Sequence, residues 1–95
     1  MAAYLIAHLE VSDPKDFGVY RAKVSAVVEK FGGRYLIRGG GIDVLEGHWP
    51  IERLVVIVFD SADQARRFYA SPEYQEILPL RLKSTSGPVV IADGV

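Results

Sequence analysis

Hydrophobic and polar positions alternate with a period of two in the first segment of the chain. Between Tyr4 and Val11, one alternate set is wholly apolar, and the other set is mixed and contains His8. This alternation is typical of a strand with one dry face and one partly polar face. We therefore expect a first strand over Tyr4–Val11.

The apolar spacing then changes to three and four residues. Apolar residues from Phe17 to Phe31, with Tyr20 among them, follow this spacing and predict an amphipathic helix. Ser12 or Asp13 is suited to cap its start, because a short polar side chain can accept hydrogen bonds from the first helical N–H groups. The two glycines after Phe31 favour the left-handed backbone that ends many helices.

Two short strands joined by a turn are expected next. Arg34–Arg38 and Ile42–Gly47 have the composition of strands, and Gly39–Gly41 lies between them. Two strands joined by glycines indicate a hairpin, with or without a bulge. Residues 48–50 then predict a corner, because the proline in this segment lacks an N–H donor and fixes the local backbone.

The segment Arg53–Asp60 contains the most apolar run of the chain, the six residues Leu54–Phe59. This run is too short and too rich in β-branched residues for a typical helix, so it predicts a strand. A strand that is apolar on both faces must be covered on both sides. A second helix is expected to start at Ser61 or Asp63.

The remaining elements are marked by prolines. Ser71 and Pro72 are expected to end the second helix, and Pro72–Leu78 predicts a short further helix that is interrupted near Pro79. Whether this helix continues to Lys83 is left open. A last strand is expected over Val89–Ala92.

The principal elements follow the order strand, helix, strand, strand, helix, strand. This order matches the split βαβ, ferredoxin-like arrangement of the α+β class, with an antiparallel sheet and both main helices on one face. Residues 1–95 are expected to form a single domain of this kind. The apolar run Leu54–Phe59 would leave an uncovered sheet face in a monomer, so we expect a homodimer packed sheet to sheet.

Composition and charge exclude several classes of protein. The 95 residues are 49% hydrophobic, with 11 basic and 12 acidic side chains and a net charge of −1, which argues against a nucleic-acid or anionic-membrane binder. The chain has no cysteine, so disulfides, thiolate metal sites and cysteine nucleophiles are excluded. The first residues lack the pattern of a signal peptide, and no apolar run is long enough to span a bilayer. We expect a cytoplasmic protein.

Several short motifs resemble a known family. The chain is similar to a family of small bacterial proteins, known only as a domain of unknown function, within the dimeric α+β barrel superfamily. The motifs that carry the resemblance span nearly the whole chain and are Tyr20, Phe31-Gly32-Gly33-Arg34-Tyr35, Arg38-Gly39-Gly40, Leu45-Glu46-Gly47, Phe59, Phe68-Tyr69, Ser71-Pro72-Glu73-Tyr74 and Arg81.

This resemblance implies the sheet-to-sheet dimer, but it implies no single reaction. Relatives in the superfamily include antibiotic-biosynthesis monooxygenases, muconolactone isomerases, heme-degrading enzymes and proteins without an assigned activity. A shared fold does not transfer an activity from one member to another.

The two histidines are candidates for proton transfer. His8 lies on the mixed face of the first strand, where it is either a catalytic or orienting group or a hydrogen-bonded core or interface residue. His48 lies at a strand end, where it either faces a ligand or belongs to a surface turn. No spacing motif joins the two, so no metal site is predicted.

Arg38 is the leading candidate for binding a negatively charged group. Its guanidinium could hold a carboxylate or enolate through two hydrogen bonds, and the glycines that follow could let a ligand approach the backbone. The alternative is a cross-strand ion pair between Arg38 and Glu46. Arg34 and Arg38 would share a face if the strand pairs regularly. The three glycines lack the spacing of a nucleotide-binding loop.

Four aromatic residues and one arginine complete the candidate binding residues. Tyr20 belongs either to the core or to a ligand site, and Tyr69 and Tyr74 flank the Ser-Pro break at a possible pocket rim. Arg81 could reach a pocket or the dimer partner. Trp49 is either a lid or an interface anchor.

Two functions are consistent with these features. The first is a small enzyme that needs no cofactor, or a related metabolite binder, that acts on a small carbonyl, enolisable or aromatic compound. In it, Arg38 would stabilise negative charge, and His8 or His48 would move a proton. The alternative is a non-catalytic dimeric module that binds a small ligand or a partner protein.

Overall fold

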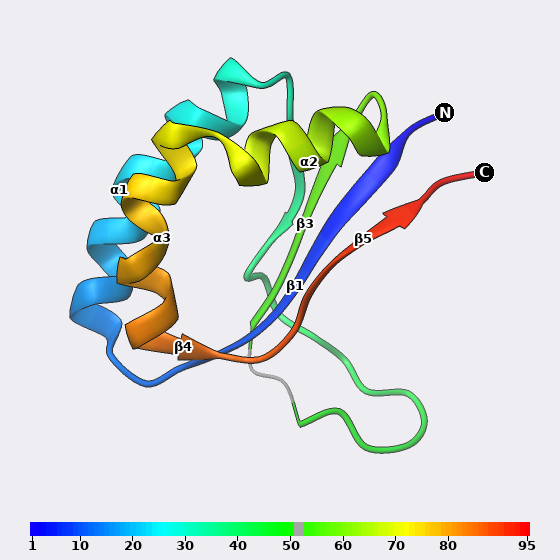
Figure 1. Ribbon diagram of the computed structural model, residues 1–95. Helices are drawn as coiled ribbons and strands as arrows, with labels where there is room; N and C mark the ends of the chain where they lie inside the picture. The colour runs from blue at the N-terminus through cyan, green and yellow to red at the C-terminus, as the bar shows by residue number, and fades with distance from the viewer. Residues whose placement is uncertain (51–52) are drawn as a thin grey trace.

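The predicted order of principal elements is confirmed. The computed structural model describes residues 1–50 and 53–95. The elements are β1 (Ala3–Val11), α1 (Pro14–Lys30), β2 (Arg34–Arg38), β3 (Arg53–Phe59), α2 (Ala62–Ala70), α3 (Pro72–Ser84), β4 (Thr85–Ser86) and β5 (Val89–Asp93). All three helices cover one face of the sheet, and the strands next to the two chain ends run side by side (Figure 1).

The sheet has the antiparallel ferredoxin-like topology. Its order is β2-β3-β1, and both β4 and β5 pair with the other edge of β1. The pairs Glu10–Ser86 and Ala7–Val89 keep one register, so β4 and β5 form a single edge strand with a break between them. His8 N–H spans that break by donating a hydrogen bond to the carbonyl of Pro88, at 3.0 Å.

The expected dry face of the first strand packs against the helices. Its residues Leu5, Ala7 and Leu9 are buried together with Ile57 and Phe59 of β3. The helices contribute the rest of this core, namely Phe17, Tyr20, Val24, Val28, Ala65, Phe68, Tyr74, Ile77 and Leu78. The amphipathic pattern of α1 therefore points in the predicted direction.

Each helix begins at a capping side chain. Asp13, and not Ser12, accepts hydrogen bonds from the first N–H groups of α1. Ser61 caps α2, and Ser71 caps α3 after ending the helix before it. Such caps satisfy N–H groups that have no partner within the helix.

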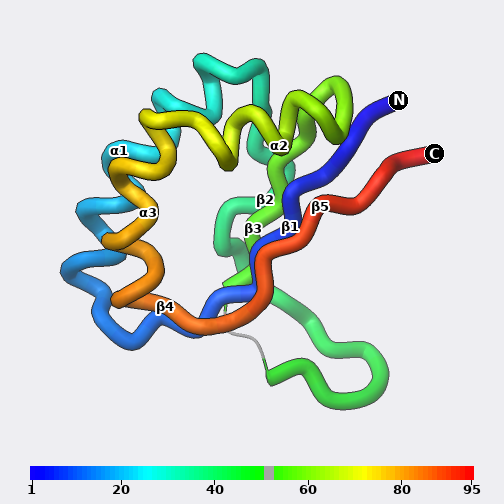
Figure 2. Tube along the Cα trace, in the orientation of Figure 1, coloured from blue at the N-terminus to red at the C-terminus, as the bar shows by residue number. Residues whose placement is uncertain are grey.

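The strand expected over Ile42–Gly47 is wrong. Residues 39–50 contain neither helix nor strand, and they extend away from the helices (Figure 2). The partner of β2 is β3, and the amide of Gly39 continues this ladder by donating to the carbonyl of Leu54. The hairpin expected around the three glycines does not form, and β2 is an edge strand that pairs with β3.

The interruption expected near Pro79 is also wrong, because α3 continues to Ser84. A proline inside a helix costs about 3 kcal/mol. The residues on either side, Ile77, Leu78 and Arg81, are buried, whereas Pro79 itself is exposed. Burial of this helix face against the core offsets the cost of the proline.

The second face of the sheet carries apolar side chains that no helix covers. By the strand register, Ile6 of β1, Val56 of β3, Ile37 of β2 and Val90 of β5 share this outer face. Ile37 and Val90 are 40% and 50% exposed. In the described part of the chain, no helix has the length and apolar character to cross a membrane.

Replacement of Gly33 by alanine is expected to destabilise the fold. A Cβ at this position would lie 2.8 Å from the ring of Phe59 and 2.8 Å from Val28, both fully buried. Overpacking of this kind costs about 1–3 kcal/mol. Urea unfolding should show this loss for Gly33→Ala and a much smaller change for Gly40→Ala, whose Cβ would meet nothing within 4 Å. Equal effects of the two substitutions would contradict this packing.

Candidate functional site

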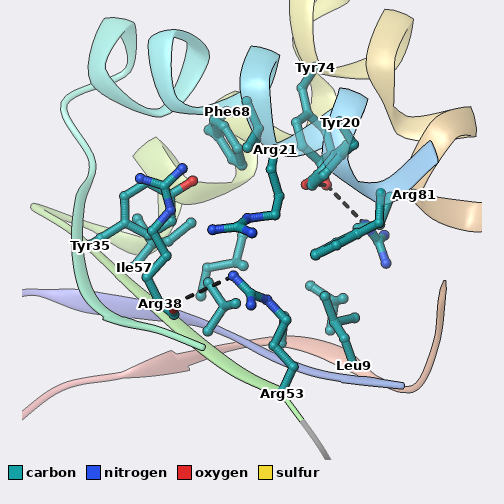
Figure 3. A pocket seen from close by; sticks show the side chains of 16 residues that line it. Leu9, Tyr20, Arg21, Tyr35, Arg38, Arg53, Ile57, Phe68, Tyr74 and Arg81 are labelled. Carbon is teal, nitrogen blue, oxygen red and sulfur yellow. Dashed lines mark hydrogen bonds between the residues drawn. The ribbon is translucent and has the colours of Figure 1, made fainter. Parts of the chain in front are cut away.

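A pocket lies between the helices and the inner face of the sheet. The cavity itself has a volume of about 40 Å3, and it opens to solvent at its mouth. Its walls come from β1, β2, β3, α1, α2, α3 and β5 (Figure 3). Much of its lining is apolar, including Leu5, Ala7, Val55, Ile57 and Phe68. This is the general character of a small-molecule site, in which a few polar groups project from apolar walls.

Four arginines supply most of the polar groups of this pocket. They are Arg21 of α1, Arg38 of β2, Arg53 of β3 and Arg81 of α3. No aspartate or glutamate belongs to the lining described by the structure. None of the four arginines is ion-paired within residues 1–50 and 53–95. The pocket therefore holds positive charge that these residues do not neutralise.

Three of these residues, Arg21, Arg38 and Arg53, form a group that we call the mouth arginines. Figure 3 shows the guanidinium groups of Arg21 and Arg53 facing each other, with that of Arg38 over the ring of Tyr35 beside them. Burial lowers the pKa of Arg53, and the positive charges of Arg21 and Arg38 lower it further. Arg21 and Arg38 are exposed, so their side chains can move when a ligand enters the pocket.

A β-bulge directs Arg38 into the pocket. Tyr35 pairs with Ile57 and Arg38 with Val55, with a register shift between Tyr35 and Ile37. An extra residue in one strand reverses the alternation of side chains beyond it. Arg34, paired with Val58, therefore faces the outer side, and the expectation that Arg34 and Arg38 share a face is wrong.

Arg38 is held by neighbours other than the predicted Glu46. Its Nη2 donates to Ser25 Oγ at 2.7 Å, and its guanidinium carbon lies 4.5 Å from the centre of the Tyr35 ring. Glu46 is exposed in the segment after β2, where no strand forms, so the cross-strand ion pair is wrong. The charge of Arg38 remains available at the pocket.

The guanidinium of Arg53 occupies the space where a side chain at Gly39 would lie. Gly39 has φ of 72°, and a Cβ there would overlap the Arg53 guanidinium. Arg53 Nη2 donates weakly to the carbonyl of Arg38 at 3.5 Å, and the Arg53 guanidinium lies 5.2 Å from the centre of the Phe17 ring. Its buried Nε has no hydrogen-bond partner in the described part of the chain. A buried donor without a partner is costly, and an anion would satisfy it.

The other side of the pocket contains a buried polar cluster, Tyr20, Tyr74 and Arg81, which we call the deep end (Figure 3). The two tyrosine hydroxyls lie 2.8 Å apart, and Arg81 Nε donates to the Tyr74 hydroxyl at 3.3 Å. Tyr20, Tyr74 and Arg81 are only 8%, 3% and 6% exposed. Burial is the main reason that the pKa of Tyr20 is raised well above its usual range, and the nearby Tyr74 raises it further.

Four of the residues singled out from the sequence thus line one pocket, namely Tyr20, Arg38, Tyr74 and Arg81. Tyr69 packs against Tyr74, with ring centres 5.3 Å apart, and lines a separate shallow hollow beside β5.

The remaining candidates lie outside this pocket. His8 faces the outer side of the sheet and packs against Trp49, with ring centres 4.8 Å apart. Trp49 and Glu46 line a shallow hollow beside the segment after β2, and His48 is exposed in the same segment. The two histidines are therefore not brought to the arginines.

Sequence reasoning missed Arg21, Arg53 and Tyr35 as pocket residues. Arg21 follows Phe17 by four residues and therefore lies at the edge of the apolar stripe of α1. Arg53 alternates with Val55, which places it on the inner face of β3. Both faces of β3 are apolar, so this alternation did not reveal which face meets the helices.

The described histidine, aspartate and glutamate side chains form no cluster of metal ligands. Within residues 1–50 and 53–95, no three histidine, aspartate or glutamate side chains are grouped so as to hold a metal ion. The polar groups of the pocket are cations and hydroxyls, which suit an anionic organic ligand.

The fold is shared with several solved structures. RPA0582 of Rhodopseudomonas palustris, a protein of unknown function, has a TM-score of 0.80 at 13% identity, over 99% of this chain and 82% of that chain. SnoaB of Streptomyces nogalater, a cofactor-independent oxygenase, has a TM-score of 0.64 at 14% identity, over 99% and 93% of the two chains. At these identities, the likeness shows a common fold.

A third solved structure shares the fold, and the sequence matches one family profile. A Caulobacter crescentus protein named after the antibiotic biosynthesis monooxygenases has a TM-score of 0.66 at 17% identity, over 99% of this chain and 90% of that chain. No curated protein matches the sequence significantly. The profile of the domain of unknown function DUF1330 matches residues 2–95. Because this match covers almost the whole chain, the protein belongs to the DUF1330 family.

Proposed function

We propose that the protein binds a small organic anion in the arginine pocket and acts on it without a cofactor. The observation that carries this proposal is the set of four arginines in a pocket whose described lining contains no carboxylate. Grouped like charges repel one another, and a bound anion relieves that repulsion. The compounds that fit are small carbonyl, enolisable or aromatic metabolites that bear a negative charge.

The arginines and tyrosines give the pocket the means to stabilise an enolate. A guanidinium can donate two parallel hydrogen bonds to a carboxylate or to adjacent oxygens, as Arg38 is placed to do. Fixed donors in a site that excludes water stabilise developing negative charge strongly. The similarity of the fold to SnoaB, described as a cofactor-independent oxygenase, supports a reaction of this kind without a cofactor.

A second candidate function is a non-catalytic binding module. No histidine, aspartate or glutamate belongs to the described lining, so the pocket has groups that stabilise charge but none of the usual general bases. His8 or His48 could serve as a base only if the chain or its partner brought one of them to the ligand. Enolisation of the bound compound separates the two functions, since a module would bind it without exchanging its protons.

The proposal includes a cytoplasmic homodimer formed by the outer faces of two sheets. The outer face is apolar around Ile6, Ile37, Val56 and Val90, and all described helices lie on the other side. Exposed apolar surface of this extent is typical of an interaction site. His8, packed on Trp49 at the same face, would then be an interface residue.

Val56→Glu is expected to dissociate the dimer, because it places a charge at the centre of the outer face. Light scattering on a sizing column should give twice the 10.5 kDa chain mass for the wild type and the single-chain mass for the variant. Leu82→Glu, on the exposed side of α3, should leave the dimer intact. A monomeric wild type would refute the sheet-to-sheet dimer.

Arg38→Ala is expected to weaken anion binding about tenfold or more, because a charge-assisted pair is lost. NMR titration with pyruvate, acetoacetate and benzoate measures this affinity, and deuterium exchange at the pyruvate methyl group in D2O measures enolisation. Arg66→Ala is the control, since Arg66 is exposed and paired with Asp63. Binding unchanged in Arg38→Ala, or absent in the wild type, would contradict the proposed site.

The raised pKa of Tyr20 predicts a loss of stability at high pH. An unfolded tyrosine ionises near pH 10, whereas folded Tyr20 stays protonated, so its contribution is present below about pH 10 and is lost above it. The loss is about 1.4 kcal/mol per pH unit. Urea unfolding at pH 9 and pH 11 should show a smaller pH effect for Tyr20→Phe than for the wild type.

A further inference from the structure

The pocket presents positive charge at two separate places. The mouth arginines project from α1, β2 and β3, and they include the two exposed arginines of the site. The deep end contains a fourth arginine among buried tyrosines. The sheet side of the pocket is its floor and is apolar, with Leu5, Ala7, Val55 and Ile57. Leu9, also apolar, lies between Arg53 and Arg81 (Figure 3).

The deep end has a hydrogen-bond donor to spare. Tyr20 and Tyr74 carry one hydroxyl proton each, and the short contact between their oxygens uses only one of these protons. Arg81 Nε already donates to the Tyr74 oxygen. Whichever hydroxyl donates to the other, one O–H has no acceptor among the hydrogen bonds of the described residues. One of the two tyrosines thus offers a donor to an incoming oxygen.

Arg81 adds a full positive charge at the same place. It is 6% exposed and forms no ion pair within residues 1–50 and 53–95. A buried charge without a partner is strongly unfavourable, and neutral hydroxyls compensate for it only in part. An acceptor that carries a negative charge satisfies both the guanidinium and the spare O–H.

The mouth arginines also favour a negatively charged ligand, for reasons that do not depend on the deep end. They comprise three cations, and the buried Nε of Arg53 has no partner in the described part of the chain. A single carboxylate cannot bridge an apolar floor to reach both places. A phosphate group concentrates its charge at one point, whereas these cations are separated by hydrocarbon.

We infer that the ligand is a small dicarboxylic acid, with one carboxylate at the mouth arginines and the other at the deep end. This inference rests on the proposed function, because it assigns the chemical class of the anion that the same pocket binds. The hydrocarbon between the two carboxylates packs on the apolar floor. Arg81 then determines specificity, because it selects for the second negative charge.

Matched acids test this inference on the wild-type protein. Calorimetric and NMR titrations compare succinate and glutarate with butyrate and valerate, which have the same chain lengths but one carboxylate. The better diacid should bind at least tenfold more tightly than its matched monoacid, because a charge-assisted contact is worth about that much. Inorganic phosphate should bind more weakly than the better diacid.

Two variants locate the second carboxylate. Arg81→Met should remove most of the advantage of the diacid over the monoacid, whereas Arg38→Gln should weaken both acids and preserve their ratio. If Arg81→Met does not fold, as judged by circular dichroism, Tyr74→Phe takes its place and should reduce the same ratio. Arg67→Met, an exposed arginine of α2, is the control for loss of a positive charge.

The possible outcomes separate this inference from the proposed function. Equal affinities for diacids and monoacids, or tighter binding of phosphate, would overturn the dicarboxylate and leave an anion site. An advantage of the diacid that persists in both Arg81→Met and Tyr74→Phe would refute the deep end as the second subsite. Absence of binding by every acid would refute the proposed function itself.

Discussion

The strand β3 is apolar on both faces, and this property shapes both the core and the outer surface of the sheet. Its inner residues, Ile57 and Phe59, are buried under the helices together with the dry face of β1. Its outer residues, Val56 and Val58, lie on the side that no described helix covers. One strand therefore anchors the core and also leaves an apolar surface, and a second copy of the chain would bury that surface.

The pocket is formed where this core is incomplete. Arginines from three neighbouring elements enter the space between helices and sheet instead of apolar side chains, and Arg53 has a lowered pKa because burial and its neighbours disfavour its charge. A protein gains nothing in stability from grouped cations. Their presence in an otherwise apolar cavity is the physical argument that the site is made for a ligand, since perturbed charges gather at functional sites.

Local backbone features position these charges. The bulge in β2 directs Tyr35 and Arg38 inward, although regular alternation would have separated them. The left-handed Gly39 that follows leaves space for the Arg53 guanidinium, so the glycine expected to admit a ligand admits a side chain of the protein. At the deep end, the hydroxyl groups of Tyr20 and Tyr74 are hydrogen-bonded to each other, and Arg81 Nε donates to the Tyr74 hydroxyl. Arg53 and the deep end are thus held by contacts within the protein.

Local patterns in the amino-acid sequence were enough to predict several of the elements. Alternation gave β1, three- and four-residue spacing gave α1, and the apolar run gave β3, because each periodicity reports which face of a single element is buried. The same reasoning identified Arg38, Tyr20, Tyr74 and Arg81 as candidates, but it could not bring them together.

The strand pairing and the assembly of the site depend on contacts between segments that are distant in the sequence. The strand β2 pairs with β3, whose inner face is buried in the core, and residues 42–47 form no strand. This pairing joins segments that are distant in the sequence, so the pattern of a single segment does not reveal it. Continuation of α3 through Pro79 likewise depends on burial of Ile77 and Leu78. The convergence of four arginines from four elements is set by long-range packing, which no local pattern records.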